Sequence, residues 1–412
     1  MTTAELPADA TATANRAGIY LAFLQLVFTL GWTTYLIYLP KLAAQVGIAP
    51  GAVILILMLD QAIFTITDTA MGIVADRIAS LIGRLGVFAA ALTALSCAAF
   101  AALPFVAGAG AKVPLIVLIA IWAITSSALR APPLILLGKY CARPRLPFLA
   151  ALVLLGYGLA GAASPYLGVV LRDVDPRLPF VISSVVLLLT TLALSRVERD
   201  VARVASPKKP PKPAKPFGTV PVLFVAAMIL LSLGYQLHFS INSAPFYLRF
   251  AKPTDLQWLM PVFWIGFNIA MFPASAVVKH RGALIVMGVA GLLGAAAVLV
   301  AETAGGLNTL IVAQFVAGAA WGCMLMSAVS AALAIGHTGA EGKVTGLVFS
   351  ALALATFARM AAVAGGLQKL PEYAPLLHWA PIACWSVAGC GLLVIAAARV
   401  QHSVQVRGVP SS

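Results

Sequence analysis

Apolar residues in this chain gather in long uninterrupted runs, which short polar segments separate. Each run is near or above the roughly 20 residues that an α-helix needs to cross the hydrocarbon of a membrane. A bilayer offers no partners for open backbone groups, and the runs lack the alternation of barrel strands, so we expect helices. The pattern predicts twelve spans, at 17–40, 49–74, 81–106, 113–138, 146–171, 178–196, 218–248, 257–279, 282–303, 308–336, 342–367 and 376–399.

The composition excludes a water-soluble protein. Hydrophobic residues make up 61% of the 412 positions and charged residues only 10%, far from the balance of soluble domains. There are 27 Lys and Arg against 13 Asp and Glu, but they lie between apolar runs and not on one soluble face, as a nucleic-acid binder requires. We therefore expect an all-α integral membrane protein, with a lipid bilayer and no nucleic acid among its partners.

The positive charges predict the orientation of the helices. With the N-terminus inside, 18 of the 27 Lys and Arg fall on the cytoplasmic side, seven on the other side and two within spans. Basic loops stay on the cytoplasmic side, so both termini are expected there, in the cytoplasmic (inner) membrane. The first apolar run is too long for a signal-peptide core and is expected to be retained.

One stretch interrupts the apolar pattern at length, at 197–217 (VERDVARVASPKKPPKPAKPF). Its repeated Pro and Lys favour an extended, solvated segment, either as a simple spacer or as a docking site for lipid headgroups or a protein. It divides six spans from six. We expect two pseudo-symmetric six-helix bundles, at 1–196 and 218–412, with 197–217 as a cytoplasmic linker.

The second run carries carboxylates inside apolar sequence, which is rare. Asp60, Phe64, Asp68, Gly72 and Asp76 follow one another at four-residue steps, so they share one side of a helix. A glycine in such a stripe lets another helix approach closely, and charge at the membrane exit can hold a neighbouring helix end. The stripe is predicted to face a partner helix and to end in a gate.

The loop after this stripe resembles the signature between the second and third helices of the major facilitator superfamily. The matching residues are Gly72, Asp76-Arg77 and Gly83-Arg84. The resemblance implies twelve helices in two bundles that rock about a central site, with Gly72, Asp76, Arg77 and Arg84 as a gate. Asp68, with Met71-Gly72 behind it, is also similar to the cation-symporter branch for glycosides, pentosides and hexuronides.

Asp60 and Asp68 are candidates for coupling to a proton or a cation. Asp60 is the acid deepest in the predicted membrane region, where a carboxylate must be protonated, paired or next to water. It either carries the coupling ion or has a structural partner such as Arg130. Asp68 lies two turns nearer the cytoplasm; the symporter resemblance implies a cation site there, and the alternative is a part in the gate.

Arg130 and Arg359 are candidate substrate residues because an arginine cannot discharge by losing its proton and needs an anion inside a membrane. Arg130 precedes Pro132 and Pro133, which are expected to kink its helix beside a cavity. Its anion is either a substrate or a carboxylate such as Asp60. No acid lies inside the span of Arg359 or the adjacent ones, which leaves an anionic substrate or backbone carbonyls.

The seventh run is unusually polar (GYQLHFSINSAPFY). His238 and Asn242 fall on a different side of the helix from Gln236, Ser240 and Ser243, so these residues cannot all face one cavity. We take His238 and Asn242 as candidate substrate residues. His238 fits a proton relay and a satisfied buried histidine equally well.

Two further candidates come from the first and fifth runs. Gln25 shares helical spacing with Thr29 and Trp32 and either lines the cavity or bonds to a neighbouring helix. Tyr157 lies beside the glycines of the fifth run and is either a cavity aromatic or a packing residue.

The motifs of soluble enzymes are missing. No GxxxxGK[ST] segment is present, and two intramembrane acids with scattered histidines supply no catalytic or metal cluster. The five cysteines show no CxxC spacing. We expect no enzyme, no cofactor and no metal.

The combined pattern predicts a monomeric secondary active transporter that works by alternating access. Two intramembrane arginines against two acids, one of them assigned to the gate, favour a small carboxylate-like organic anion, with proton coupling through Asp60. The alternatives are a sugar or glycoside symporter using sodium at Asp68, an uncoupled facilitator or efflux carrier, and a non-transporting assembly or sensor protein.

Overall fold

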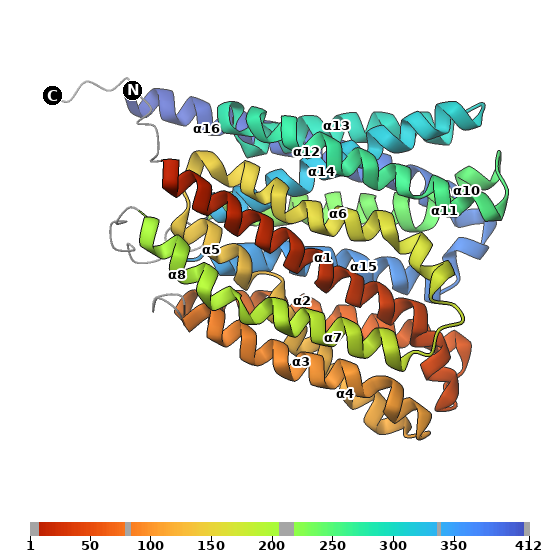
Figure 1. Ribbon diagram of the computed structural model, residues 1–412. Helices are drawn as coiled ribbons and strands as arrows, with labels where there is room; N and C mark the ends of the chain where they lie inside the picture. Colours follow the sequence, from red (N-terminus) through yellow and green to blue (C-terminus); the bar gives the residue numbers. More distant parts are fainter. Residues whose placement is uncertain (1–7, 79–83, 206–217, 336–338, 408–412) are drawn as a thin grey trace.

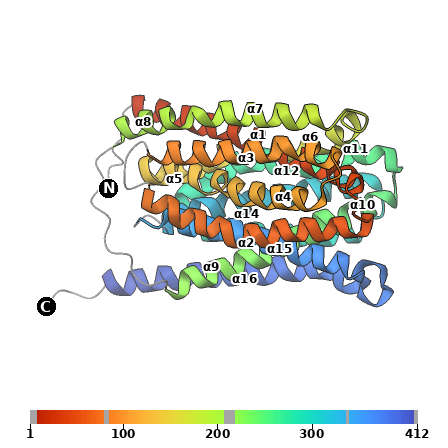
Figure 2. The same cartoon turned by 90° about the horizontal axis from the view of Figure 1, so that it is seen from below.

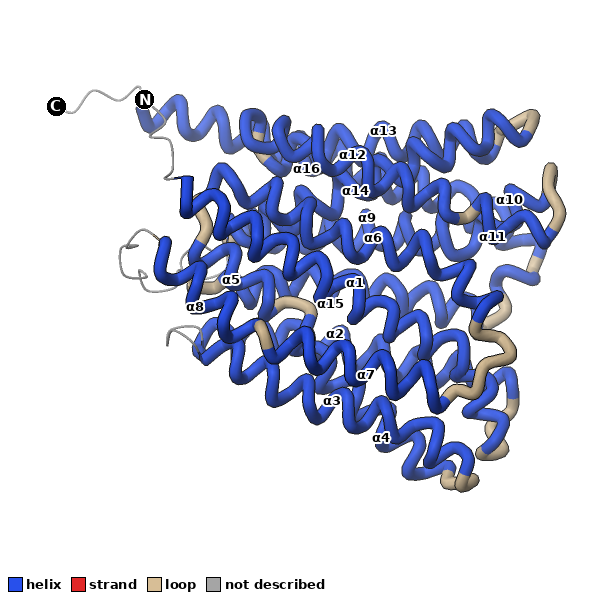
Figure 3. Tube along the Cα trace, in the orientation of Figure 1, coloured by secondary structure: helices blue, strands red, loops and turns tan. Residues whose placement is uncertain are grey.

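The computed structural model describes residues 8–78, 84–205, 218–335 and 339–407. Over these ranges the chain is helical, with turns and short connections between the helices (Figure 3). Twelve stretches are long and apolar enough to cross a membrane, as the sequence predicts. Six of them extend three or more residues beyond a predicted end, because these helices continue past the apolar runs into the polar flanks.

The first six spans hold eight α-helices. The fourth span consists of α4 and α5 with a break between them, and the sixth of α7 and α8. The bounds are α1 (Ala8–Gln45), α2 (Val53–Ile78), α3 (Arg84–Gly108), α4 (Lys112–Ser126), α5 (Pro132–Tyr140), α6 (Leu146–Val170), α7 (Arg177–Leu192) and α8 (Leu194–Val204).

The last six spans also hold eight α-helices. The seventh span contains a π-helical turn at His238–Asn242, between α9 and α10. The bounds are α9 (Thr219–Leu237), α10 (Ser243–Leu248), α11 (Leu256–Leu259), α12 (Pro261–Arg281), α13 (Ala283–Glu302), α14 (Leu307–Ile335), α15 (Glu341–Ala364) and α16 (Ala374–Arg407).

The start of α1 and the end of α16 lie at the same end of the molecule, here named the terminal end; the opposite end is named the far end (Figure 1). The helices run roughly between these two ends, and α3 and α4 diverge from α13 towards the far end. Figure 2 shows α9 and α16 side by side on one flank and α7 and α8 on the other.

The two halves of the chain meet through a few helix pairs. α2 lies along α15, and α6 along α12. At the terminal end α5 also contacts α14 and α15. The second and fifth spans of the first half thus pack against the eleventh and eighth spans of the second half, the exchange expected of two pseudo-symmetric bundles.

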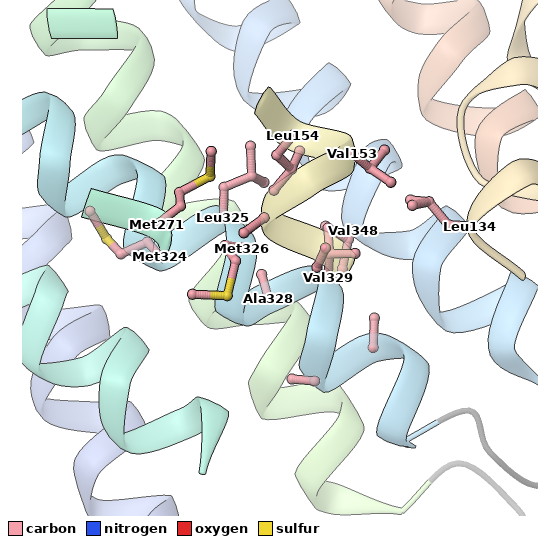
Figure 4. Close-up of a cluster of buried hydrophobic side chains, with 14 of the residues drawn as sticks. Leu134, Val153, Leu154, Met271, Met324, Leu325, Met326, Ala328, Val329 and Val348 are labelled. Carbon is pink, nitrogen blue, oxygen red and sulfur yellow. The ribbon is translucent and has the colours of Figure 1, made fainter. Parts of the chain in front are cut away.

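A hydrophobic core crosses this junction near the terminal end. Leu154 of α6, Leu325 and Val329 of α14 and Val348 of α15 are all at most 5% exposed and belong to one packed cluster (Figure 4). Because the cluster draws on both halves, its burial holds the two bundles together at the terminal end.

The predicted linker begins later than the sequence suggested. Residues up to Val204 belong to α8, so 197–204 is helical and not extended. Glu198 is fully buried and its Oε2 accepts a hydrogen bond of 2.9 Å from the backbone N–H of Gly86 in α3. Positions 206–217, with the Pro and Lys repeats, lie outside the described residues.

Candidate functional site

Asp76 joins the two halves at the terminal end. It lies in the last turn of α2, and its two carboxylate oxygens accept hydrogen bonds from the backbone N–H groups of Gly342 and Lys343, at 2.6 and 2.8 Å. These groups belong to the first turn of α15, where the unpaired N–H groups and the helix dipole favour a negative charge. Asp76 is therefore a clamp between the bundles, as the gate resemblance implies.

Glycines let α2 and α15 touch backbone to backbone below this clamp. A Cβ atom on Gly72 would overlap the carbonyl of Gly342, and one on Gly346 would overlap the carbonyl of Asp68. Thr69 and Ser350 share a hydrogen bond of 2.7 Å across the same contact between α2 and α15, here named the seam. The predicted stripe on α2 does face a partner helix, and its glycine makes the close contact possible.

The other two gate residues lie at the terminal ends of α2 and α3. Arg77 follows Asp76 in the last turn of α2, and Arg84 begins α3. Gly83, which completes the resemblance, lies outside the described residues.

The fourth span is broken at Arg130. α4 ends at Ser126, a 3-10 turn covers Ser127–Leu129, and α5 starts at Pro132. Proline at the first helical positions lacks an N–H group that an interior helix position would need, so the helix restarts there. The kink predicted from the two prolines is confirmed, and it turns Arg130 towards α2.

Arg130 pairs with Asp68 of α2. Its Nη1 donates to Asp68 Oδ2 at 3.0 Å, and its guanidinium lies 3.7 Å from the centre of the Phe64 ring. Asp68 and Phe64 are fully buried, while the Arg130 side chain keeps 17% of its surface accessible. The sequence suggested a carboxylate such as Asp60 as the partner of Arg130. The ion pair instead forms with Asp68, which lies two helical turns nearer the break.

Asp60 is held by a neutral group. It is fully buried, and its Oδ2 accepts a hydrogen bond of 2.8 Å from the hydroxyl of Tyr35 in α1. Its Oδ1 has no hydrogen-bond partner. Trp32 and Trp122 pack against Tyr35, with ring centroids 5.4 and 4.5 Å away. The Tyr35 ring that holds Asp60 is thus packed against two tryptophan rings, and within the described residues Oδ1 of Asp60 stays without a partner.

Arg359 of α15 differs from Arg130 in its surroundings. Within the described residues no carboxylate lies in ion-pair range of its guanidinium, and its buried Nε has no hydrogen-bond partner. The side chain is half-buried and acts electrostatically on Tyr235 of α9. A permanent cation inside an apolar bundle is costly without an anion, so the position is suited to an incoming negative charge.

Two tyrosines connect the arginines across the bundles. The hydroxyl of Tyr157 in α6 interacts with that of Tyr235 in α9. Arg130 acts on Tyr157 and Arg359 acts on Tyr235. Two arginines and two tyrosines, one of each from either bundle, therefore form a chain of electrostatic neighbours across the junction, here named the tyrosine and arginine centre. Sequence reasoning missed Tyr235, because a tyrosine in an apolar run carries the same signal as ordinary packing.

His238 and Asn242 do not join this centre. Both are buried inside the second bundle: His238 Nε2 lies 3.1 Å from Gln314 Oε1, and Asn242 Nδ2 donates to the carbonyl of Leu377 at 2.9 Å. These partners belong to α14 and α16. The polar turn is therefore tied to its own bundle, which supports the structural alternative for His238 and indicates a structural role for Asn242 as well.

Gln25 makes a local contact. Its Nε2 donates to the hydroxyl of Thr29, one turn later on α1, at 3.1 Å. The side chain is half-buried, and no bond from it to the arginines is observed within the described residues.

Two hollows lie away from the arginines. One of about 20 Å³ is lined by residues that include Phe28, Trp32, Ser96 and Ser184, with room for about one water molecule. The other, of about 340 Å³, lies between α13 and α14. Neither hollow includes a charged lining residue, so neither offers a counter-charge to an ionic substrate.

Comparisons with known proteins agree with this architecture. The model of the Major Facilitator Superfamily matches residues 21–360. No match is found among curated protein sequences. Three similar solved structures show the same fold at low sequence identity.

A bacterial homologue of the iron transporter ferroportin in an outward-facing state has a TM-score of 0.71 at 12% identity, covering 92% of this chain and 99% of that one. The Escherichia coli fucose:proton symporter FucP gives 0.68 at 13%, covering 93% and 99%. The human organic anion transporter MFSD10 gives 0.64 at 16%, covering 92% and 98%.

The twelve spans in two bundles agree with the fold of this family. The chain belongs to the major facilitator superfamily and is a secondary transporter, not an enzyme.

Proposed function

We propose that the protein carries a small organic anion with a carboxylate group across the cytoplasmic membrane, as a monomer, by alternating access. The observation that carries this proposal is Arg359, a half-buried cation in the eleventh span without a carboxylate in ion-pair range among the described residues. Arg130 already has Asp68, so Arg359 leaves the centre with an uncompensated positive charge. An anion supplies the missing counter-charge.

The conformation fits one end state of such a cycle. Asp76, the glycine seam and the shared core seal the junction at the terminal end, while α3 and α4 diverge from α13 towards the far end (Figure 1). With the termini in the cytoplasm, as the positive charges predict, this is an outward-facing state. The similar ferroportin homologue was solved in an outward-facing state.

Proton coupling is assigned to Asp60. A fully buried carboxyl group with one unpartnered oxygen favours a bound proton, and a change of conformation that admits water would release it. The alternative of a sodium site at Asp68 is less favoured, because the guanidinium of Arg130 already occupies one carboxylate oxygen of Asp68.

Uptake into liposomes tests the proposal. The purified protein is reconstituted and screened with radiolabelled carboxylates, sugars and amino acids, with and without an imposed pH gradient. Carboxylate uptake that the gradient increases supports the function. Uptake that is equal when the gradient is collapsed rejects the coupling, and uptake confined to neutral sugars rejects the anion.

A further inference from the structure

An aromatic wall that includes both tyrosines lies where α6 packs against α12. The wall consists of Tyr157 from α6, Tyr235 from α9, Phe239 from the π-helical turn and Trp264 from α12. Ring centroids lie 5.3 Å apart for Tyr157 and Trp264, 5.4 Å for Phe239 and Trp264, and 5.8 Å for Tyr235 and Phe239. The wall therefore spans both bundles.

Further rings hold this wall rigidly from behind. Tyr235 stacks on the fully buried Trp321 with a centroid distance of 4.5 Å and an interplanar angle of 2°. Phe239 packs on Phe263, 4.7 Å away, and Phe263 is 1% exposed. Rings locked by other rings keep their faces and edges in fixed directions, which is the condition for recognising a flat ligand.

A glycine of α6 makes room for the wall at the junction between the two bundles. A Cβ atom on Gly161 of α6 would lie 2.5 Å from the Trp264 ring. The absence of side chains at this point lets Trp264 of the second bundle reach Tyr157 of the first.

Tyr157 and Phe239 are the members of the wall that keep accessible surface. Both are half-buried, whereas Tyr235 and Trp264 are each 5% exposed. Tyr157 packs edge-on against Trp264 of α12, and Phe239 packs against Phe263 and Trp264 of the same helix, so both rings border the contact between α6 and α12. A ligand that contacts these two side chains lies beside the interacting hydroxyls of Tyr157 and Tyr235, and Tyr235 is within electrostatic range of Arg359.

We infer that the substrate is an aromatic carboxylate, whose flat ring packs on the aromatic wall while its carboxylate meets the guanidinium of Arg359. This inference rests on the proposed function and narrows it. Arg359 supplies the positive charge, and the tyrosine hydroxyls donate hydrogen bonds that orient the carboxylate. The edges and faces of the rings favour a ligand with a planar ring over one with a saturated ring.

Matched pairs of anions test this selection on the purified full-length protein. Benzoate is compared with cyclohexanecarboxylate, and 2-naphthoate with decahydro-2-naphthoate, by equilibrium binding. Members of a pair share charge and approximate size and differ in planarity. We expect the aromatic member to bind about 2- to 12-fold more tightly, the range that one specific aromatic contact supplies. Benzyl alcohol, which lacks the charge, should not compete.

Two variants test whether the preference for aromatic anions depends on the aromatic wall. Phe239→Leu keeps an apolar side chain but removes the ring, so the aromatic preference should fall towards equality while binding of the saturated anions is retained. Phe148→Leu is the matched control, because Phe148 forms an aromatic pair with Phe272 on the same two helices, α6 and α12, outside the wall. It should leave the preference unchanged.

The outcomes separate the two proposals. Tighter aromatic binding that Phe239→Leu abolishes supports the inference. Equal binding of both members of each pair, or a preference that Phe239→Leu leaves intact, overturns the aromatic wall and retains an anion carrier. If none of the four carboxylates binds, or if benzyl alcohol binds as well as benzoate, the anion site itself is wrong.

Discussion

Arg130 forms its ion pair with Asp68 at 3.0 Å and not with Asp60, although both acids lie on α2, two turns apart. The break between α4 and α5 places the guanidinium at the level of Asp68, over the ring of Phe64. Asp60 is left with the neutral hydroxyl of Tyr35. The two acids of one helix thus differ in their partners: Asp68 has a cation, and Asp60 has a neutral hydroxyl, which is why proton coupling is proposed for Asp60.

The Asp68 and Arg130 pair should behave as a unit in stability measurements. Asp68→Asn removes the counter-charge of a mostly buried guanidinium, and we expect a loss of about 2–4 kcal/mol, because breaking one side of a buried pair leaves the other uncompensated. The double variant Asp68→Asn/Arg130→Gln should lose less than the sum of the two single variants. Thermal unfolding of all four proteins in detergent measures this; additive losses contradict the pairing.

Asp76→Asn should loosen the closed terminal end. The asparagine keeps one acceptor oxygen but lacks the charge that the first turn of α15 favours, a loss of about 1–2 kcal/mol. The open population should rise about 5- to 30-fold. Maleimide labelling of Cys141, which is 4% exposed at the end of α5, followed by peptide mass spectrometry, reports this opening. Asp200→Asn on α8 is the control, since Asp200 is exposed.

Unchanged labelling of Cys141 in Asp76→Asn would show that the carboxylate does not hold the two bundles together.

Gly72→Ala should impair transport through the helix seam. Its Cβ atom would overlap the carbonyl of Gly342, so α2 and α15 must separate, at about 1–3 kcal/mol for an overpacked contact. We expect uptake to fall by about tenfold or more. Gly168→Ala on α6 makes the same substitution where no atom lies within 4 Å and should transport normally. Equal activity of the two variants argues against a close seam in the transport cycle.

Asp60→Asn should separate transport from the proton gradient. An asparagine oxygen still accepts the hydrogen bond from Tyr35 but cannot take up a proton. We expect accumulation driven by a pH gradient to fall to the level seen without a gradient, while exchange of substrate at equal concentrations continues. Tyr35→Phe, which removes the hydrogen bond and keeps the carboxyl group, should retain coupling. Accumulation that persists in Asp60→Asn assigns the proton to another group.

The fold could be predicted from the sequence because the bilayer imposes it. Long apolar runs without strand alternation can pair their backbone groups in lipid only as helices. The stripe from Asp60 to Asp76 also has the period of a helix. The break at Arg130 was also predictable, since two consecutive prolines leave a helix few alternatives.

The site could be predicted only in part, because which charged groups meet depends on helix rotation and register. Arg359 was correctly identified as a cation without an acid in adjacent spans, a property of the sequence alone. The partner of Arg130 was not fixed, since Asp60 and Asp68 share one face of α2 and a shift of two turns exchanges them.

The seventh span shows a second reason why the site could be predicted only in part. His238 and Asn242 looked like cavity residues because they are polar, but the π-helical turn and the partners Gln314 and Leu377 tie them to α14 and α16. Tyr235, three residues before His238, faces the centre instead, and nothing in an apolar run distinguishes it from packing.

The most direct test is substrate counterflow in liposomes, which requires a carrier but no driving force. Vesicles loaded with the unlabelled carboxylate that the uptake screen identifies are diluted into a trace of the labelled form, using wild type, Arg359→Ala and Arg172→Ala. Arg172 is exposed in the loop after α6 and controls for loss of an arginine. The account predicts counterflow in wild type and Arg172→Ala and its loss in Arg359→Ala; full counterflow in a folded Arg359→Ala protein would contradict it.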